Sequence, residues 1–429
     1  MTLPSSSNES LFPRALMGFV IGIAVIGIAL GVFIARRDAA LQTIVSLTPT
    51  RTGEVERCLS CHSGIEPISP SHSIEDFGCV SCHGGDRLAL EADRAHEGMV
   101  RNPAALDAAQ QYCGECHAGQ IATVQRTLMT TYAGAITLIR RSFGQQPDGT
   151  AQYAIQAVDH LQAFTVTDAD PHPVQQFAQN CLTCHITGQP EPVTDRYRST
   201  GCATCHVLYA SDGRYTGGDP TISRDESGHA QTHQFTTAIP YTQCNHCHNR
   251  GNYDLRTMTF VPRADMPYTA ATVLEQRAHD YYQPIAQFTL CEWELDCVDC
   301  HTSHEVMGDA VIYSQQTQSR YVECRTCHGT PTELPREAVV ASEDEIAMTR
   351  ANLNPNISLA VGDTIMVTDR GEPLYHIQHV DDQWVLTGKV TGISYPIPLV
   401  QGSTCQQDPN DQSSASCHQC HTYDRSSTP

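Results

Sequence analysis

Cysteine and histidine recur at one fixed spacing in this chain of 429 residues. The spacing is Cys-x-x-Cys-His, in which two thiols lie about one helical turn apart and an imidazole follows directly. Such thiols can form thioethers with both vinyl groups of a porphyrin, and the imidazole can bind its iron from one side. The pattern occurs nine times: Cys58, Cys61 and His62; Cys79, Cys82 and His83; Cys113, Cys116 and His117; Cys181, Cys184 and His185; Cys202, Cys205 and His206; Cys244, Cys247 and His248; Cys297, Cys300 and His301; Cys324, Cys327 and His328; and Cys417, Cys420 and His421.

The number of copies decides between the alternatives for this motif. A single copy would also suit a thioredoxin-like redox pair, and two copies would suit a zinc site. Nine copies, each closed by His and together using 18 of the 20 cysteines, favour attachment of haem. We therefore predict nine covalently bound haem c groups, with the motif histidines as proximal ligands of the iron.

The ligand on the other face of each iron determines what that iron can do. A second imidazole closes the iron and suits electron transfer, whereas an empty position admits a substrate. Of the 21 histidines, nine close a motif and twelve do not. We expect eight of the twelve to be distal ligands, mainly because they lie close to a motif in the sequence: His72, His96, His229, His233, His246, His279, His304 and His418.

Two cysteines, Cys291 and Cys405, belong to no motif. Outside the cytoplasm, two leftover cysteines favour a disulfide, and both lie in the distal half of the chain. We predict that they pair, with unpaired thiols or an intermolecular bridge as the alternatives.

Length and charge limit the fold that can hold nine porphyrins. The motifs leave on the order of 40 residues for each haem, which is too little for separate apolar cores. We therefore predict a multihaem cytochrome c fold, mostly irregular with some α-helix, in which the haems form the core. The formal net charge of −21 argues against nucleic acid as a partner, because that binding needs a basic face.

An apolar run precedes the first motif. Residues 15–35 carry no charge and are long enough to cross a bilayer as a helix. A cleaved signal peptide is the alternative, but its apolar region is usually shorter. Arg36 and Arg37 would favour a cytoplasmic location for the following residues. Haem c is attached outside the cytoplasmic membrane, so we predict a single-pass anchor with the haem domain on the periplasmic or extracellular side.

The chain divides into five predicted segments. These are a tail at 1–14, the transmembrane anchor at 15–35, a linker at 36–54, a multihaem domain with eight haems at 55–330, and a C-terminal region with the ninth haem at 331–429. Cys79 follows Cys58 by 21 residues and Cys202 follows Cys181 by the same step, with Gly78 and Gly201 directly before the second motif. This correspondence indicates an internal duplication of a three-haem unit.

Regular elements are predicted in three places. Apolar residues from Ile121 to Ile139 recur at helical spacing and predict an amphipathic helix ending near Gly144. A second helical segment is predicted at 153–164. β-branched and apolar runs at 363–369, 374–380, 384–386 and 388–390 predict a small antiparallel β meander, with His376 and His379 at its surface.

Several segments between and around the motifs resemble a group of bacterial exported multihaem c-type cytochromes. They are RTLMTTYAGAI at 126–136, GCATCHV at 201–207, GHAQTH at 228–233, IPYTQCNHCHNRG at 239–251, CVDCHTSHEVMGD at 297–309 and GDTIMVTDRGEPLY at 362–375. The resemblance spans roughly 55–421 and implies low-spin haems packed in a chain, with a role in respiratory electron transfer. One departure is Cys405, which no second Cys and His follow in register, as after loss of a site.

Together these features predict a membrane-anchored nonahaem c-type cytochrome. It would pass electrons along mostly bis-His haems, from a redox protein or quinol-oxidising membrane complex to other cytochromes or an exported acceptor. One alternative is a reductase of a nitrogen or sulfur compound at one open haem, although the chain has no CxxCK motif and has enough histidines to close every iron. Another is a subunit of an extracellular cytochrome filament, against which the uncleaved anchor counts. We expect an electron-transfer protein rather than an enzyme.

Overall fold

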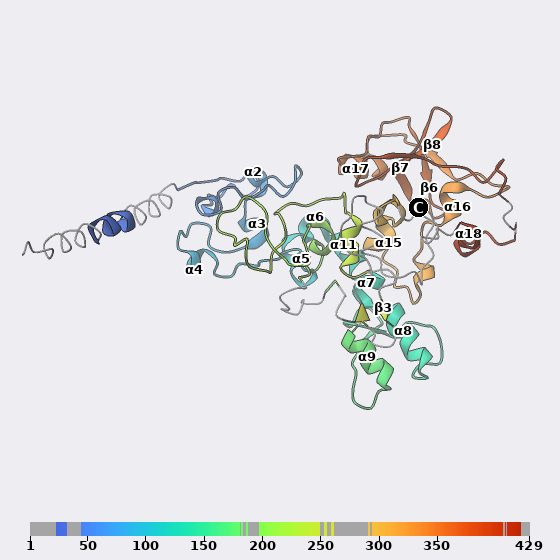
Figure 1. Cartoon of the computed structure of the whole chain (residues 1–429), viewed down its shortest axis with the longest axis horizontal. Helices are drawn as coiled ribbons and strands as arrows, with labels where there is room; N and C mark the ends of the chain where they lie inside the picture. Colours follow the sequence, from blue (N-terminus) through green and yellow to red (C-terminus); the bar gives the residue numbers. More distant parts are fainter. Residues whose placement is uncertain are drawn as a thin grey trace, which may run out of the picture. The chain divides into compact units, whose positions relative to one another are not determined.

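A computed structural model describes residues 23–31, 44–180, 182, 186–187, 197–248, 253–254, 259–260, 291, 294–405, 408 and 410–421. These residues form short helices joined by long irregular segments, and one small sheet lies near the C-terminal end of the chain (Figure 1). The prediction of a mostly irregular chain with a small antiparallel sheet is confirmed. The chain forms two compact units, which are described separately.

The first unit comprises Met1–Ile65, Ile74–Met99 and Asp219–Thr221. Its helices are the 3-10 helix η1 (Cys58–Ser60), α2 (Ile74–Phe77), α3 (Val80–His83) and α4 (Ala92–Ala95). Residues 23–31 are helical with exposed apolar side chains, and the other residues of the predicted anchor lie outside the described part. Among the described residues, no helix is both long enough and apolar enough to cross a bilayer.

The second unit comprises Glu66–Ser73, Val100–Gly218 and Ile222–Pro429. Its elements before residue 300 are α5 (Leu106–Tyr112), α6 (Gly114–Val124), α7 (Leu128–Thr131), α8 (Ala133–Ser142), β1 (Tyr153–Ala154), β2 (Gln162–Ala163), α9 (His172–Asn180), α10 (Ala203–His206), α11 (Tyr241–Asn245), β3 (Tyr253–Asp254), β4 (Thr259–Phe260) and α14 (Cys297–Cys300). The later elements are α15 (Ser303–Met307), η3 (Gln316–Gln318), α16 (Cys324–His328), β5 (Glu337–Val339), α17 (Ile346–Asn352), β6 (Thr364–Val367), β7 (Pro373–Val380), β8 (Gln383–Thr387), β9 (Ser394–Pro396) and α18 (Ser414–Cys420).

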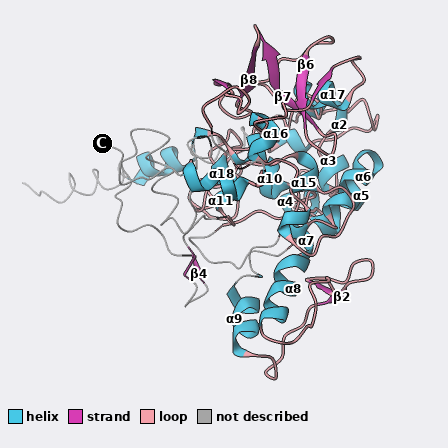
Figure 2. Cartoon of the chain, turned by 90° about the vertical axis from the view of Figure 1, so that its right-hand side faces the viewer, coloured by secondary structure: helices cyan, strands magenta, loops and turns pink. Residues whose placement is uncertain are grey.

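The segment 133–180, with α8 and α9, forms a small helical lobe, and the region before it and within it differs from the sequence prediction (Figure 2). The single helix predicted from Ile121 to Ile139 is wrong, because three helices (α6, α7 and α8) cover this region. The Thr127 hydroxyl accepts a hydrogen bond from the Thr130 N–H and caps α7, and Tyr132 ends α7 in the left-handed conformation, with φ 54°. These local interactions interrupt the helical periodicity.

The helix predicted at 153–164 is also wrong. This segment contains the short parallel strands β1 and β2, with Tyr153 opposite Gln162. Phe164 instead packs with Ile136 of α8 and with Phe177 of α9, so the lobe has an apolar core of its own. The lobe therefore differs from the haem-motif regions, because apolar side chains alone can fill it.

The C-terminal sheet has five antiparallel strands in the order β5-β6-β7-β8-β9. The predicted meander is confirmed for β6, β7 and β8, whereas the predicted strand 388–390 is wrong, because these residues lie in a loop before β9. Both faces of β7 are covered: Ile377 packs in one apolar cluster, and Ile365 of the neighbouring strand packs with helix α17 in another.

This double coverage decides the position of the two strand histidines. His376 of β7 is fully buried, and its Nε2 lies 2.9 Å from the carbonyl oxygen of Asp299 in α14. The predicted surface location of His376 is therefore wrong. His379, near the end of the same strand, is exposed as predicted. The sheet consequently contacts a haem motif directly, at Asp299.

Candidate haem-binding sites

Eight of the nine motifs lie in the described part of the chain, and they share one local conformation. In seven of them the backbone N–H of the motif histidine donates to the carbonyl of the first cysteine, at distances from 2.7 Å at His248 to 3.0 Å at His62. The eighth lies within helix α16. This single helical turn places both thiols on one side with the imidazole beside them, which suits attachment to one porphyrin edge.

The fourth motif cannot be placed in the same way. Cys181, Cys184 and His185 all lie outside the described residues. Their assignment as haem attachment points and proximal ligand therefore stays a prediction from the sequence.

The second cysteine of each motif follows the same turn but differs in exposure from site to site. The N–H groups of these cysteines donate to the carbonyl of the first cysteine at 3.1 Å in the first and sixth motifs, and at 3.2 Å in the second and third. The thiol-bearing residues are partly buried at Cys61, Cys82, Cys205 and Cys247 and exposed at Cys116 and Cys420. We therefore expect the third and ninth haems to be more open to solvent than the others.

The ninth motif retains the turn although little of the chain covers it. The His421 N–H donates to the Cys417 carbonyl at 2.9 Å, directly after helix α18. His421 itself is exposed. Its backbone thus suits the predicted role of proximal ligand, and that role stays a prediction.

Four motif histidines are oriented by a hydrogen bond at Nδ1. With Nδ1 engaged, Nε2 is the nitrogen that would bind iron, which is the usual arrangement of a metal-binding histidine. The Nδ1 partners are Asp219 Oδ2 for His62 (2.7 Å), the Thr236 carbonyl for His206 (2.8 Å), Glu305 Oε1 for His301 (2.9 Å) and the Pro398 carbonyl for His328 (2.7 Å).

Two histidine pairs have the separation expected on opposite sides of one iron. The ring centres of His96 and His62 lie 6.0 Å apart, as do those of His72 and His117, and we call His96 and His72 the facing histidines. Two metal–nitrogen bonds of about 2 Å, together with about 1 Å from each nitrogen to its ring centre, give a separation of about 6 Å. The residues present therefore fit a bis-His haem at the first and third motifs.

His72 is also oriented by its neighbours. Its Nδ1 lies 3.2 Å from Ser69 Oγ and 3.1 Å from Ser71 Oγ. Burial, and then the charge of His117, lower the pKa of His72. A lowered pKa favours the neutral imidazole, which is the form that binds metal.

Of two further predicted distal ligands, His233 has a hydrogen-bonded Nδ1, and His304 has an Nδ1 that lies near a carboxylate without a hydrogen bond. His233 Nδ1 lies 3.0 Å from the Glu66 carbonyl, and His304 Nδ1 lies 3.2 Å from Glu372 Oε2. Glu372 is almost fully buried and also pairs with Arg350 at 2.8 Å, so it is held as a carboxylate beside His304. The hydrogen bond at Nδ1 of His233 leaves its Nε2 for a metal, and the distal role of both histidines stays a prediction.

The other predicted distal ligands differ in what the structure says of them. His246 lies flat against Tyr209, with ring centres 4.3 Å apart, and its Nε2 is 3.3 Å from the Tyr209 carbonyl. Only Nδ1 of His246 would then remain for iron. The His229 N–H donates to the Gly213 carbonyl, and burial lowers the pKa of its ring. His279 and the side chain of His418 lie outside the described part.

A buried carboxylate that sequence reasoning missed supports the second motif. Glu56 is 2% exposed, and its Oε2 accepts a hydrogen bond of 2.7 Å from the N–H of Cys79. The Cys58 and Cys79 thiols and this carboxylate lie within 4.8 Å of one another. Gly78 in the sequence could have indicated this contact. Its left-handed backbone (φ 66°) turns the chain so that the Cys79 N–H points at Glu56.

The corresponding glycine before the fifth motif has the same conformation. Gly201 has φ 64°, and the following Cys202 N–H donates to the Ala104 carbonyl at 2.9 Å. Both halves of the predicted duplication therefore use a left-handed glycine to aim the first cysteine N–H at a distant oxygen. This similarity supports the predicted repeat.

Contrary to the prediction, Cys291 and Cys405 do not form a disulfide with each other. The Cys291 thiol lies near two motif cysteines: burial and then neighbouring thiols, including that of Cys291, raise the pKa of both Cys300 and Cys327. Cys405 lies near Cys417 instead. The two cysteines are held at different motifs, and no disulfide joins them.

Two of the cavities among the described residues of the second unit are relevant to ligand binding. The larger, about 540 Å³, is lined by Ile68, Ser69, Leu208, Phe235 and Thr236, and its volume suits a cofactor-sized ligand. Phe235 contacts the His72 ring, and Thr236 holds His206, so this cavity adjoins two candidate ligands.

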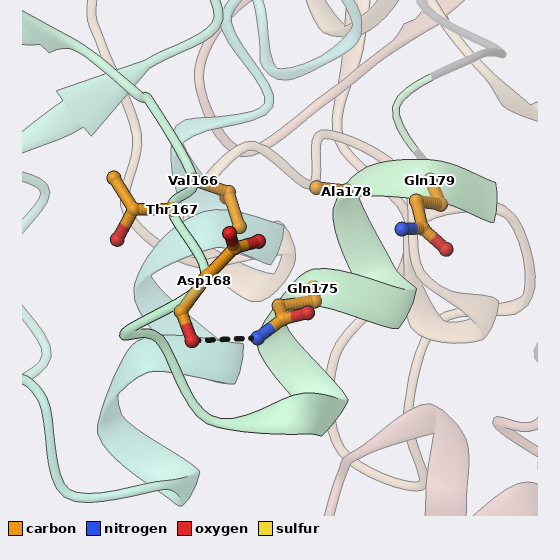
Figure 3. A pocket seen from close by; sticks show the side chains of 6 residues that line it. All are labelled: Val166, Thr167, Asp168, Gln175, Ala178 and Gln179. Carbon is orange, nitrogen blue, oxygen red and sulfur yellow. Dashed lines mark hydrogen bonds between the residues drawn. The ribbon is translucent and has the colours of Figure 1, made fainter.

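The smaller cavity, about 280 Å³, lies in the helical lobe between residues 166–168 and α9 (Figure 3). There Gln175 Nε2 donates to the Asp168 carbonyl at 3.4 Å. Its lining contains neither Cys nor His, so it offers no haem ligand.

Comparisons with protein-family models, with characterised proteins and with solved structures give no match to this chain. The assignment of the sites therefore rests on the motifs and their geometry.

Proposed function

We propose that this chain is a membrane-anchored, nine-haem c-type cytochrome of the exported multihaem kind that its sequence resembles. It would take electrons from a quinol-oxidising complex or another membrane redox protein. It would deliver them to other cytochromes or to an acceptor outside the cytoplasmic membrane. The N-terminal helix would hold the haem region at that membrane.

The observation that carries this proposal is the serial contact between motif-bearing elements of the second unit. Helix α10 of the fifth motif packs against α11 of the sixth, and α11 packs against α14 of the seventh. The seventh and eighth motifs meet at the buried thiols of Cys300 and Cys327. Helix α16 of the eighth packs against α18 of the ninth. Five motifs that follow one another in the sequence are thus also neighbours in space, which suits transfer from each site to the next.

The side chains of the protein have three tasks in this mechanism. Each bound haem would supply an iron that takes up and releases one electron. The motif histidines, oriented through Nδ1, and the facing histidines His72 and His96 would close the irons to substrate. Buried charges and nearby carbonyls would set the order of the potentials.

A reductase is the second candidate, and one group of residues favours it. The hydroxyls of Tyr313 and Tyr321 donate to Asp309 Oδ2 at 2.5 and 2.7 Å. The Tyr321 ring lies 5.7 Å from that of His304, and Arg370 lies above it. Burial, followed by the bond to Asp309, raises the pKa of Tyr321 to about 12. Such a group could deliver protons to a substrate at an open iron.

One spectroscopic experiment separates the two candidates. The detergent-solubilised holoprotein is examined by EPR and optical spectroscopy, with carbon monoxide added after reduction. An electron-transfer chain predicts nine low-spin irons and an unchanged reduced spectrum. One high-spin iron that binds carbon monoxide would overturn the simple chain and favour the reductase, and nitrite, hydroxylamine and tetrathionate would then be assayed.

A further inference from the structure

Lys389 is the single lysine among the 26 basic residues, and it is only 7% exposed. It lies in the loop that follows β8. Lysine is almost never fully buried unless its charge has a specific partner. The surroundings of this side chain therefore need a physical explanation.

The side chain and the backbone of Lys389 both bond to helix α14 of the seventh motif. Its Nζ donates to the Val298 carbonyl at 2.6 Å, and its backbone N–H donates to Asp299 Oδ1 at 2.8 Å. Val298 and Asp299 are the two residues between the cysteines of this motif. The Lys389 Nζ also lies 5.2 Å from the centre of the Tyr375 ring, which favours a cation.

The positive charge of Lys389 is not cancelled by a direct ion pair. Its hydrogen-bond partner is a backbone carbonyl, and among the ion pairs of the described residues none includes Lys389. Of two carboxylates that act on Lys389, Asp299 has its pKa raised by burial, and Glu372 is paired with Arg350 at 2.8 Å. Burial lowers the pKa of Lys389 to about 8, which still leaves it mainly protonated at neutral pH.

This charge lies close to two haem attachment points. Burial is the main cause that raises the pKa of the Cys300 and Cys327 thiols, and the Lys389 ammonium group acts on both in the opposite direction. Cys300 belongs to the seventh motif and Cys327 to the eighth. Cys327 also packs against the apolar cluster that contains Leu386, three residues before Lys389, so one cation lies near both sites.

We propose that Lys389 raises the reduction potentials of the haems held at the seventh and eighth motifs, so that electrons collect there. The inference rests on the proposed electron-transfer function. Reduction adds negative charge at the iron, and a buried cation stabilises the reduced form. At ~10 Å and an effective dielectric constant of about 20, a unit charge changes the reduction equilibrium by roughly tenfold or more. Tenfold corresponds to about 59 mV for a one-electron couple.

The test is a potentiometric titration of the full-length holoprotein, followed optically. Lys389→Gln removes the charge but keeps a hydrogen-bond donor, and Lys389→Arg keeps the charge. We expect about two of nine haems to become roughly tenfold harder to reduce in Lys389→Gln, and no change in Lys389→Arg. The matched control is Arg126→Gln, which removes an arginine paired with Asp159 and should leave the haems of the seventh and eighth motifs unchanged.

A Lys389→Gln protein that contains nine low-spin haems and titrates like the wild type would overturn the inference. If Lys389→Gln does not retain nine haems, the Asp299→Asn variant is titrated instead. Loss of this buried carboxylate should make the same two haems easier to reduce. An unchanged titration curve would contradict the role of local charge. Failure of the proposed function is recognised separately, because the wild type would then lack nine low-spin haems or would bind carbon monoxide.

Discussion

At the scale of single residues, the bond made by one nitrogen of a histidine determines what the other nitrogen can do. Asp219 is a buried carboxylate that engages Nδ1 of His62, whereas His206 and His328 use backbone carbonyls. A carboxylate makes the imidazole a stronger electron donor than a carbonyl does. The chain can therefore give chemically similar sites different potentials.

The first prediction concerns the facing histidines. His96→Ala and His72→Ala should each leave one iron without its sixth ligand, because each ring lies 6.0 Å from a motif histidine. We expect one high-spin iron in nine by EPR in each variant, and carbon monoxide binding to that iron after reduction. His379→Ala is the control, because His379 is an exposed strand residue. Nine low-spin irons in both variants would show that these pairs do not enclose iron.

The second prediction concerns the fully buried carboxylate of Asp219. Its Oδ2 lies 2.7 Å from His62 Nδ1, and its Oδ1 accepts hydrogen bonds from Thr221. Asp219→Asn removes the negative charge with little change in size, so the haem held by His62 should become easier to reduce. The expected change is about tenfold in the reduction equilibrium, or about 59 mV in a redox titration.

Asp159→Asn is the matched control for this measurement. Asp159 is an exposed carboxylate in the helical lobe, where it pairs with Arg126 at 2.7 Å. Its loss should leave all nine potentials unchanged. A downward shift in Asp219→Asn, or equal shifts in both variants, would contradict the assignment.

At the scale of elements, the haem motifs are too short to be stable helices by themselves. Helices of four or five residues, such as α3, α10 and α14, fall far below the length at which an isolated helix is stable in water. They depend on distant oxygen atoms, such as the Glu56 carboxylate for α3 and the Ala104 carbonyl for the turn that begins α10. Haem attachment would add a covalent cross-link to each turn.

The third prediction tests the turn before α10. Gly201→Ala places a methyl group against the Ala104 carbonyl in addition to forcing alanine into a left-handed backbone. Gly53 has nearly the same φ (67°) but no neighbouring atom within 4 Å of the added carbon, so Gly53→Ala measures the backbone cost alone, about 1–2 kcal/mol. We expect a larger loss of thermal stability in Gly201→Ala, and a mass one haem short in part of the protein. Equal losses of thermal stability and equal haem content in the two variants would show that the Ala104 contact is not important for this turn.

At the scale of the whole molecule, charge is the property most accessible to experiment. The formal net charge is −21, and haem propionates would make the holoprotein more acidic. A negative protein attracts cationic redox partners and repels anionic ones over roughly a Debye length. We therefore expect the natural partner to present a basic surface.

The fourth prediction follows from this charge. The reduced holoprotein is reoxidised by hexaammineruthenium(III), a cation, or by ferricyanide, an anion, in a stopped-flow instrument. Between ~0.01 M and ~0.15 M ionic strength the Debye length falls from about 30 Å to about 8 Å. The rate with the cation should fall over this range and the rate with the anion should rise. Identical salt dependences would show that electrons leave through a locally neutral or basic surface.

The helical turn at the Cys-x-x-Cys-His motifs was predictable because it depends on five adjacent residues. The same is true of the central strands, where apolar and β-branched runs are separated by Asp381 and Asp382. The positions of His376 and of the helices in the lobe were not predictable. A second covering layer buries His376, and Tyr132 interrupts a helical pattern by a backbone conformation that side-chain periodicity does not report.

The sequence by itself predicts the number and kind of haem sites, because covalent attachment needs only local spacing. Only the tertiary structure decided which groups complete each site: Asp219 lies 157 residues from His62, and the Glu372 carboxylate lies 68 residues from His304. Such contacts join segments that share no periodicity, and they form only when distant loops are brought together. The motifs thus specify what is bound, and long-range packing specifies how each site is tuned.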